Sequence, residues 1–215
     1  MPTKKEKEKA KIIFDILSKE YPNPRPALIY NSPFELLIAT ILSAQTTDDN
    51  VNKVTVNLFK KYKTPEDYVN APIEELQQDI FSTGFYKNKA RNLKGCCAGL
   101  IEKFNGEVPK KLEELVKLPG VGRKTASVVL GNAFGIPAIA VDTHVKRLSN
   151  LIGLSKNSNP DKIEADLKAL LPEEYWTNSS HWLQAHGRRI CIARRPKCDE
   201  CIIAQYCDYF KGEKK

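Results

Sequence analysis

Lys124 and Asp142 are the residues whose types and surroundings best suit covalent chemistry. Lys124 follows a glycine-containing turn at the expected start of a helix, where the helix dipole and the neighbouring Arg123 both disfavour an ammonium group. The dipole contributes only about 0.3–1 kcal/mol, so desolvation in a cleft would have to supply most of the free energy that releases the proton. A neutral amine produced in this way is a nucleophile that can form a Schiff base.

Each of these two residues also has a purely structural interpretation. Lys124 could be a surface lysine that contacts a phosphate group. Asp142 lies in the segment Val141-Asp142-Thr143-His144, directly before an apolar helical pattern, and is well suited to be a helix N-cap. Residue type and spacing therefore leave catalysis and structure open as alternatives at both positions.

Four cysteines near the C-terminus could enclose a metal centre. Cys191, Cys198, Cys201 and Cys207 have the spacing C-x6-C-x2-C-x5-C within 17 residues. A zinc ribbon usually has two C-x2-C pairs far apart, and only one such pair is present. Disulfides need an oxidising compartment, for which the chain carries no secretory signal. The spacing therefore favours a 4Fe–4S cluster, with zinc and free or bridged thiols as alternatives.

The other cysteines and two nearby histidines are expected to be structural. Cys96 and Cys97 are adjacent on an expected helix, as core or surface thiols often are. His181 and His186 lie close to the cysteine-rich end and could mimic metal ligands. Four cysteines already complete the site, so we expect these two rings to pack or to form hydrogen bonds.

Basic residues gather around the first two of the four cysteines. The segment 188–198 contains five cations. A loop held by metal ligands would present these charges rigidly to nucleic-acid phosphates. We therefore expect a structural role for the metal centre, and nothing in the sequence supports redox sensing. The five cations are Arg188, Arg189, Arg194, Arg195 and Lys197.

The segment Leu115–Gly135 has the pattern of two helices joined by a tight turn, Leu118-Pro119-Gly120-Val121-Gly122. Pro119 blocks continuation of the first helix, and the two glycines permit positive φ and close backbone approach. A glycine turn before a helix N-terminus directs free N–H groups outward, where they suit a phosphate oxygen. The alternative is a tight helical hairpin without a ligand.

Helical periodicity accounts for nearly the whole chain, which predicts an all-α protein. Ile12, Ile13, Ile16 and Leu17 are expected to share one apolar face of a helix over residues 5–20. Prolines and short polar residues predict further helix starts. These helices are expected from Pro33, from Thr47 or Asp48 to Tyr62, from Thr64-Pro65, from Pro72, over 87–103, over 109–118, from Arg123 and from Asp142.

Composition excludes several classes of protein. The chain has 215 residues, 41% hydrophobic and 28% charged, which excludes collagen-like, disordered and small disulfide-rich proteins. The apolar stretch 125–141 is interrupted by glycines and a proline and is short for a span of about 20 residues. The basic N-terminus lacks the apolar core of a signal peptide, so we expect a cytoplasmic protein. A net charge of +8 makes nucleic acid the first partner to consider.

The segments LPGVGRKTASVVL (118–130) and IPAIAVDTHVKR (136–147) resemble the catalytic stretch of the endonuclease III family of helix-hairpin-helix DNA glycosylases. The similarity extends through SAQTTDDNVNKVT (43–55), GFYKNKA (84–90), NGEVP (105–109) and the cysteine spacing. The resemblance implies that Lys124 carries the attacking amine, that Asp142 is its carboxylate partner and that the four cysteines hold one 4Fe–4S cluster. A carboxylate beside Lys124 would favour the ammonium form, so Asp142 is better suited to accepting the proton and stabilising charge at the sugar C1′.

The resemblance implies a bifunctional enzyme of base excision repair that removes oxidised pyrimidines and cuts the strand by β-elimination. Its partner is double-stranded DNA containing a damaged base or an abasic site. The base must leave the duplex first, at a cost of a few kcal/mol, and Gln45 is a candidate to fill the vacated space rather than an ordinary polar loop residue. The residues expected to contact DNA are Gln45, Leu118, Gly120, Val121, Gly122, Arg123, Lys146, Arg147, Arg194, Arg195 and Lys197.

The implied fold has two helical lobes and a C-terminal iron–sulfur cluster loop. One lobe covers residues 26–136, with the helix-hairpin-helix at about 112–131, and the other combines 1–25 with 137–215. We expect a monomer with its active cleft between the lobes. It would be nucleoid-associated in the cytoplasm if the source is prokaryotic.

Two positions depart from the family pattern, and three other functions compete with the implied one. The family often has a His-His pair where this chain has Ser180-His181, and an aromatic residue where it has Arg189. These departures affect DNA contacts rather than the reaction. The competing functions are a non-catalytic DNA-binding module with a metal clip, a monofunctional mismatch or adenine glycosylase, and an iron–sulfur electron carrier.

Overall fold

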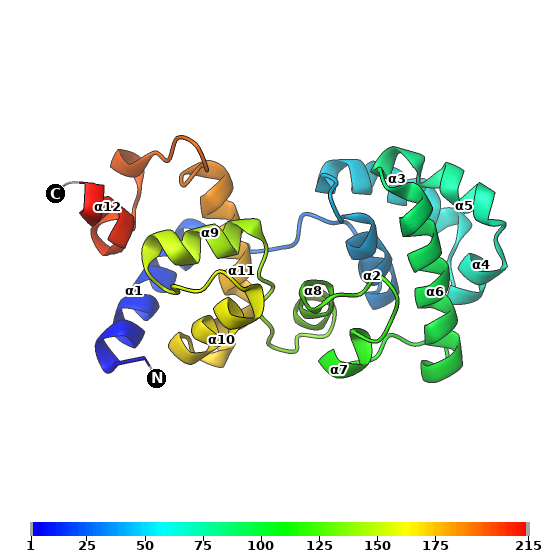
Figure 1. The fold of residues 1–215 in the computed structure, drawn as a ribbon, viewed down its shortest axis with the longest axis horizontal. Coiled ribbons are helices and arrows are strands. Elements are labelled where there is room, and N and C mark those ends of the chain that lie inside the picture. The colour runs from blue at the N-terminus through cyan, green and yellow to red at the C-terminus, as the bar shows by residue number, and fades with distance from the viewer. Residues whose placement is uncertain (1, 214–215) are drawn as a thin grey trace. The chain divides into compact units, whose positions relative to one another are not determined.

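A computed structural model describes residues 2–213 of the chain. Every regular element among these residues is an α-helix or a short 3-10 helix (Figure 1), which confirms the all-α prediction. The described residues form two compact units, one containing those up to Arg25 and from Pro137 onward, the other Pro26–Ile136. Along the described part of the chain, no helix is long and apolar enough to cross a membrane.

The Pro26–Ile136 unit is built around a helix that is buried on all sides. This helix, α2, contains seven consecutive buried residues, Leu36 to Leu42, as expected for a helix enclosed by others. It packs against α3, α6 and α8. The helices of this unit are α2 (Pro33–Leu42), α3 (Asp48–Lys61), α4 (Pro65–Asn70), α5 (Ile73–Asp79), the 3-10 helix η1 (Phe81–Thr83), α6 (Tyr86–Phe104), α7 (Leu112–Leu115) and α8 (Arg123–Ala133).

Local capping explains where most of these helices begin. The side chain of Ser32 caps α2, and Pro33 occupies the first turn of this helix, a position where proline is common. Thr47 accepts a hydrogen bond from the Asn50 N–H at the start of α3. Thr64 forms a reciprocal capping box at the start of α4. The predicted starts of all three helices are confirmed.

One predicted helix is much shorter than expected. The sequence pattern indicated a helix over 109–118, but α7 covers only Leu112–Leu115 and has no side-chain cap. Val108 and Pro109 are buried in the chain that leads into it, and the Leu118 N–H bonds the Leu115 carbonyl in a tight turn. Leu115 and Leu118 in this stretch are buried, whereas Val116 is 40% exposed, so the apolar pattern here reflects core contacts around one helical turn and not a longer helix.

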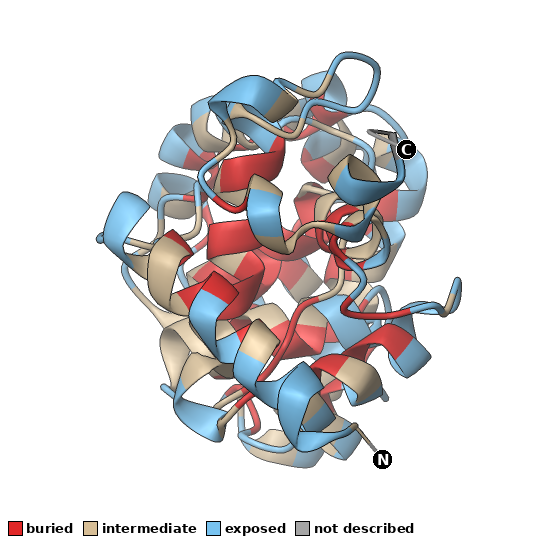
Figure 2. Cartoon of the chain, turned by 90° about the vertical axis from the view of Figure 1, so that its left-hand side faces the viewer, coloured by how far each residue is buried: buried red, intermediate tan, exposed pale blue. Residues whose placement is uncertain are grey.

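The other unit surrounds a second apolar core (Figure 2). Ala10, Ile13, Phe14 and Leu17 of α1 are fully buried in it, a spacing that keeps one face of a helix inward. The predicted face of α1 was partly wrong, because Ile12 is 37% exposed and Phe14 lies in the core instead. The elements are α1 (Lys4–Glu20), α9 (Thr143–Ile152), α10 (Pro160–Leu170), η2 (Glu173–Tyr175), α11 (Trp176–Arg189), η3 (Cys198–Glu200), η4 (Ala204–Tyr206) and α12 (Asp208–Glu213).

Candidate functional site

The turn between α7 and α8 depends on a glycine at position 120. Gly120 has φ +77°, and a Cβ atom there would lie 2.8 Å from the Cβ of Asn92. Gly122 is extended instead, with φ −87°, so the expectation of a left-handed conformation applies to Gly120 and not to Gly122. The side chains of Leu118 and Val121 are buried. Any DNA contact from those two residues must therefore come from the backbone.

The start of α8 leaves room for an anionic ligand. Its N-cap residue is Gly122, so no side chain caps the N–H groups of the first turn. Arg123 and Lys124 in this turn are both exposed. Both side chains are therefore accessible at the surface of this unit. The positive end of the helix and the two cations create a surface that attracts phosphate.

Asp142 begins α9 in the other unit. Its Oδ1 accepts a hydrogen bond from the Val145 N–H at 2.8 Å, which confirms the predicted N-cap. Burial lowers the pKa of both His144 and His181, and the charge of Asp142 opposes the lowering in each case. The carboxylate therefore has one oxygen bound to the helix backbone and lies close to two imidazole rings.

The four C-terminal cysteines line one pocket. The remaining wall of this pocket is largely apolar, with Ile152, Ile190, Ile203 and Phe210 among its residues. Within residues 2–213, no three side chains of His, Cys, Asp or Glu are grouped closely enough to hold a single metal ion.

Burial raises the pKa of the Cys191 thiol to about 11 and also raises that of Cys201. These thiols need the positive charge of a metal centre to ionise at neutral pH. The donor set and its apolar surroundings therefore fit an iron–sulfur cluster.

His186 contacts the cysteine pocket without being needed as a ligand. The ring is buried, its Nε2 lies 3.4 Å from Cys201 Sγ, and its Nδ1 lies 3.1 Å from the Tyr21 hydroxyl. Burial lowers the pKa of His186 to about 4, so the ring is neutral near pH 7. A neutral ring can accept a hydrogen bond from Tyr21 and donate one to the sulfur, in agreement with the expected hydrogen-bonding role.

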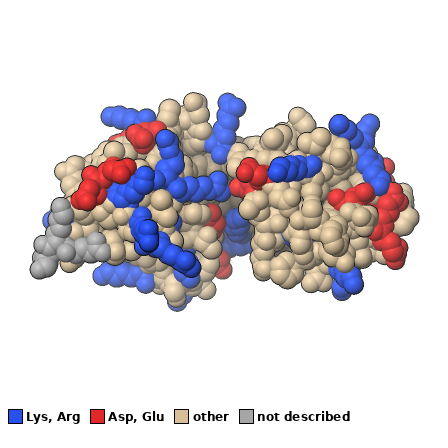
Figure 3. All heavy atoms as spheres, turned by 90° about the horizontal axis from the view of Figure 1, so that it is seen from above, with Lys and Arg blue, Asp and Glu red and all other residues tan. Residues whose placement is uncertain are grey.

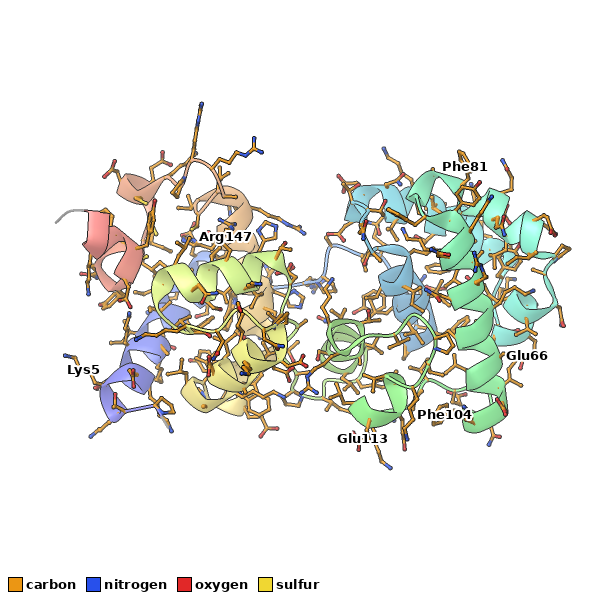
Figure 4. The ribbon with its side chains drawn as sticks, in the orientation of Figure 1. Lys5, Glu66, Phe81, Phe104, Glu113 and Arg147 are labelled. Carbon is orange, nitrogen blue, oxygen red and sulfur yellow. The ribbon has the colours of Figure 1, made fainter. Side chains whose placement is uncertain are left out.

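Arg147 is used inside the protein. Its guanidinium group donates to the carbonyl oxygens of Cys191 and Gly187 and lies 3.3 Å from Nδ1 of His144. Figure 4 shows Arg147 on α9. The planar guanidinium group thus fixes the backbone at Cys191, the first cysteine of the pocket. The sequence did not indicate this role, because Gly187 and Cys191 lie 40 and 44 residues away from Arg147 in the chain.

The loop between the first two cysteines is strongly basic at its surface. Arg194, Arg195 and Lys197 are exposed, and Lys197 lies 3.6 Å from Glu200. In the view from above, Lys and Arg side chains gather over the unit that contains this loop (Figure 3). Lys146 on α9 is half-buried. The predicted basic loop is therefore available to phosphates from its exposed side.

Gln45 lies in a turn that is strained and exposed. Its φ is +55°, a conformation that is uncommon for residues other than glycine. The adjacent Thr46 hydroxyl donates to the carbonyl oxygen of Thr83 at 2.8 Å, which joins this turn to the one before α6. In that second turn Phe85 has φ +49° and is 62% exposed. Sequence reasoning missed Phe85, although an aromatic residue after a chain-breaking glycine was a visible signal.

Comparison with known proteins identifies the group to which these features belong. A family model of the HhH-GPD superfamily of base excision DNA repair proteins matches residues 38–173, and a model of the iron–sulfur binding domain of endonuclease III matches residues 191–207. Endonuclease III of Synechocystis sp. is 50% identical over 202 residues, which are 94% of this chain and 92% of that protein. The chain belongs to the endonuclease III family.

Solved structures of an endonuclease III and of another DNA glycosylase have the same fold. A structure described as a trapped endonuclease III–DNA covalent intermediate is 47% identical, with a TM-score of 0.93 and complete coverage of both chains. A thermostable thymine-DNA glycosylase is 28% identical, with a TM-score of 0.87 over 95% of this chain and 98% of that one. The helix-hairpin-helix glycosylase fold and the single 4Fe–4S cluster of endonuclease III are thereby confirmed for this chain.

Proposed function

We propose that this protein is a bifunctional DNA glycosylase and AP lyase of base excision repair that acts on oxidised pyrimidines. The observation that carries the proposal is Lys124 at the uncapped, exposed start of α8, next to a glycine turn suited to the DNA backbone. The membership of the chain in the endonuclease III family supports it. A purely DNA-binding hairpin does not need an amine at this position.

The proposed reaction begins when the neutral amine of Lys124 attacks C1′ of the damaged nucleotide. The C1′–N bond breaks and the base leaves with its bonding electron pair, so that the lysine nitrogen replaces it on C1′. The nitrogen lone pair then forms a C=N bond as the C1′–O4′ bond of the sugar ring breaks and O4′ takes up a proton, which leaves an open-chain sugar joined to Lys124 as a protonated imine. Loss of a C2′ proton then expels the 3′ phosphate by β-elimination. Asp142 accepts the proton that the amine releases and stabilises positive charge at C1′. Because Lys124 is exposed in the free protein, we infer that bound DNA supplies its desolvation.

The iron–sulfur cluster is proposed to shape a DNA-contact loop. Cys191, Cys198, Cys201 and Cys207 would hold it, since all four line the pocket described above. When bound, the cluster supplies a rigid cross-link between chain segments and takes no part in bond breaking. Arg147 stabilises this loop through its hydrogen bond to the Cys191 carbonyl, and the prediction that it also contacts DNA stays a prediction. Arg194, Arg195 and Lys197 are then held facing the phosphates.

We propose that Gln45 and Phe85 enter the DNA when the damaged nucleotide rotates out. Both side chains are exposed on turns with left-handed backbone, where strain is often associated with function. The amide of Gln45 can hydrogen-bond the orphaned base, and the ring of Phe85 can replace lost stacking. We also propose that the protein works as a monomer in the cytoplasm, where its DNA substrate lies.

Borohydride reduction tests the proposed lyase chemistry. The protein is incubated with duplex DNA containing an oxidised pyrimidine, and borohydride should trap a covalent complex. Lys124→Ala should abolish the complex, whereas the matched control Lys103→Ala, an exposed lysine at the end of α6, should retain it. Base release without trapping would instead indicate a monofunctional glycosylase, and DNA binding without base release would indicate a binding module.

A further inference from the structure

We propose that Thr46 and Lys89 are positioning residues for base extrusion, because they hold the Gln45 turn in place through one shared backbone oxygen. The shared acceptor is the carbonyl of Thr83, 37 residues away from Thr46 in the chain. This inference rests on the proposed function, in which Gln45 enters the DNA. In this proposal, Thr46 and Lys89 act through Gln45 and touch neither the DNA nor the reacting sugar.

The carbonyl oxygen of Thr83 accepts two side-chain hydrogen bonds. The Thr46 hydroxyl donates to it at 2.8 Å and the Lys89 amine at 2.7 Å. A carbonyl oxygen has two lone pairs, so these two donors saturate it. The bond from Lys89 is charge-assisted and therefore the stronger of the two. Thr83 itself is fully buried, and its own hydroxyl donates to the Ile80 carbonyl.

Lys89 is an unusual residue for this location. Its side chain is only 4% exposed, and burial lowers its pKa. It also lies near the N-terminal end of α6, where a positive charge is unfavourable. A hydrophobic residue would fill the same space without either cost. The lysine therefore suits a specific task, and its described contact is the Thr83 carbonyl.

A second hydrogen bond joins the first turn of α3 to the 3-10 helix η1, beside these two turns. Besides the bond from Thr46, the side-chain amide of Asn50 donates to the Ser82 carbonyl at 2.8 Å. Gln45 lies directly before Thr46, so the Thr46–Thr83 bond fixes the end of its left-handed turn. The same contacts join this turn to the segment that carries Gly84 and the exposed Phe85. The turns that carry Gln45 and Phe85 thus support each other through the Thr46–Thr83 bond.

A preorganised turn matters only for the step that removes a base from the stack. Inserting a loosely held side chain would require ordering it at the same time as the base unstacks, which raises the barrier. A preformed abasic site has no base to extrude, so cleavage there depends far less on this turn. Base release and strand cleavage should therefore respond differently when the shared carbonyl loses a donor.

The test compares single-turnover base release from an oxidised pyrimidine with strand cleavage at a preformed abasic site. Thr46→Val removes the hydroxyl at nearly constant shape and should slow base release at least fivefold, with abasic-site cleavage changed less than twofold. Thr46→Ser, which keeps a hydroxyl, should restore base release. Lys89→Met should act in the same direction as Thr46→Val. Thr64→Val, which removes a helix cap in the same unit, should lower thermal stability without slowing base release.

Gln45→Ala separates failure of this inference from failure of the proposed insertion. If Gln45→Ala slows base release and Thr46→Val does not, the positioning role is wrong while the insertion role stands. If Gln45→Ala has no effect, both are wrong. The double variant Gln45→Ala/Thr46→Val should be no slower than Gln45→Ala alone, because the hydroxyl acts through Gln45. A slower rate of base release in the double variant than in Gln45→Ala would overturn the inference. This comparison does not require that Lys89→Met folds.

Discussion

Asp142 performs two functions in the proposed mechanism, and substitution can separate them. Its Oδ1 caps α9 by accepting the Val145 N–H at 2.8 Å, and its charge is proposed to act on the Lys124 amine and on C1′. Asparagine is as good an N-cap as aspartate but carries no charge. Asp142→Asn therefore keeps the cap and removes the carboxylate, whereas Asp142→Ala removes both.

The two effects have different expected magnitudes. Loss of an N-cap side chain costs typically about 1 kcal/mol, within a range of about 0.5–2 kcal/mol. For a domain of this size, about 1 kcal/mol corresponds to a Tm difference of about 2–4 °C. Asp142→Ala should therefore melt about 2–4 °C below Asp142→Asn. Loss of a general base lowers the rate by about 10²–10⁴-fold, and both variants should show this loss equally.

The assay pairs thermal unfolding of the cluster-containing protein with single-turnover base release. Asp142→Ser is a useful third variant, because serine also caps helices and lacks the charge. It should be as stable as Asp142→Asn and equally slow. Full activity of Asp142→Asn would refute the catalytic role of the carboxylate and leave only the cap. Equal melting temperatures for Asp142→Asn and Asp142→Ala would refute the energetic importance of the Val145 contact.

Two further substitutions test the elements that support the site. Gly120→Ala should destabilise the protein by about 1–2 kcal/mol or more and weaken DNA binding, because its φ is positive and its Cβ would meet Asn92 at 2.8 Å. Gly122→Ala, which has open space and an ordinary φ, is the matched control in thermal unfolding and should lose much less stability. Arg147→Met should speed the loss of cluster absorbance under a chelator, because it leaves the Cys191 carbonyl without its charged donor at a cost of about 1–3 kcal/mol. Unchanged cluster retention would show that this contact does not support the loop.

Prediction from sequence succeeded where the cause of a structure lies within a few residues. Thr47 and Thr64 cap helices through N–H groups three positions away, so their roles follow from residue type and order. The cysteine spacing indicated a metal centre for the same reason. Prediction failed at residues 109–118, where apolar residues that look helical are used as core contacts around a single turn.

The sequence by itself determined the helical class, most helix starts and the cysteine spacing of the metal loop, because each depends on local spacing. The candidate amine, Lys124, followed from the resemblance of its surrounding segment to a known family. Only the tertiary structure showed that Lys124 is exposed, that Arg147 holds the Cys191 carbonyl and that Lys89 meets Thr46 at Thr83. The physical reason is distance along the chain. Residues that are tens of positions apart in the chain come into contact only when whole helices pack. The sequence around one such residue does not indicate which distant polar group it will hydrogen-bond.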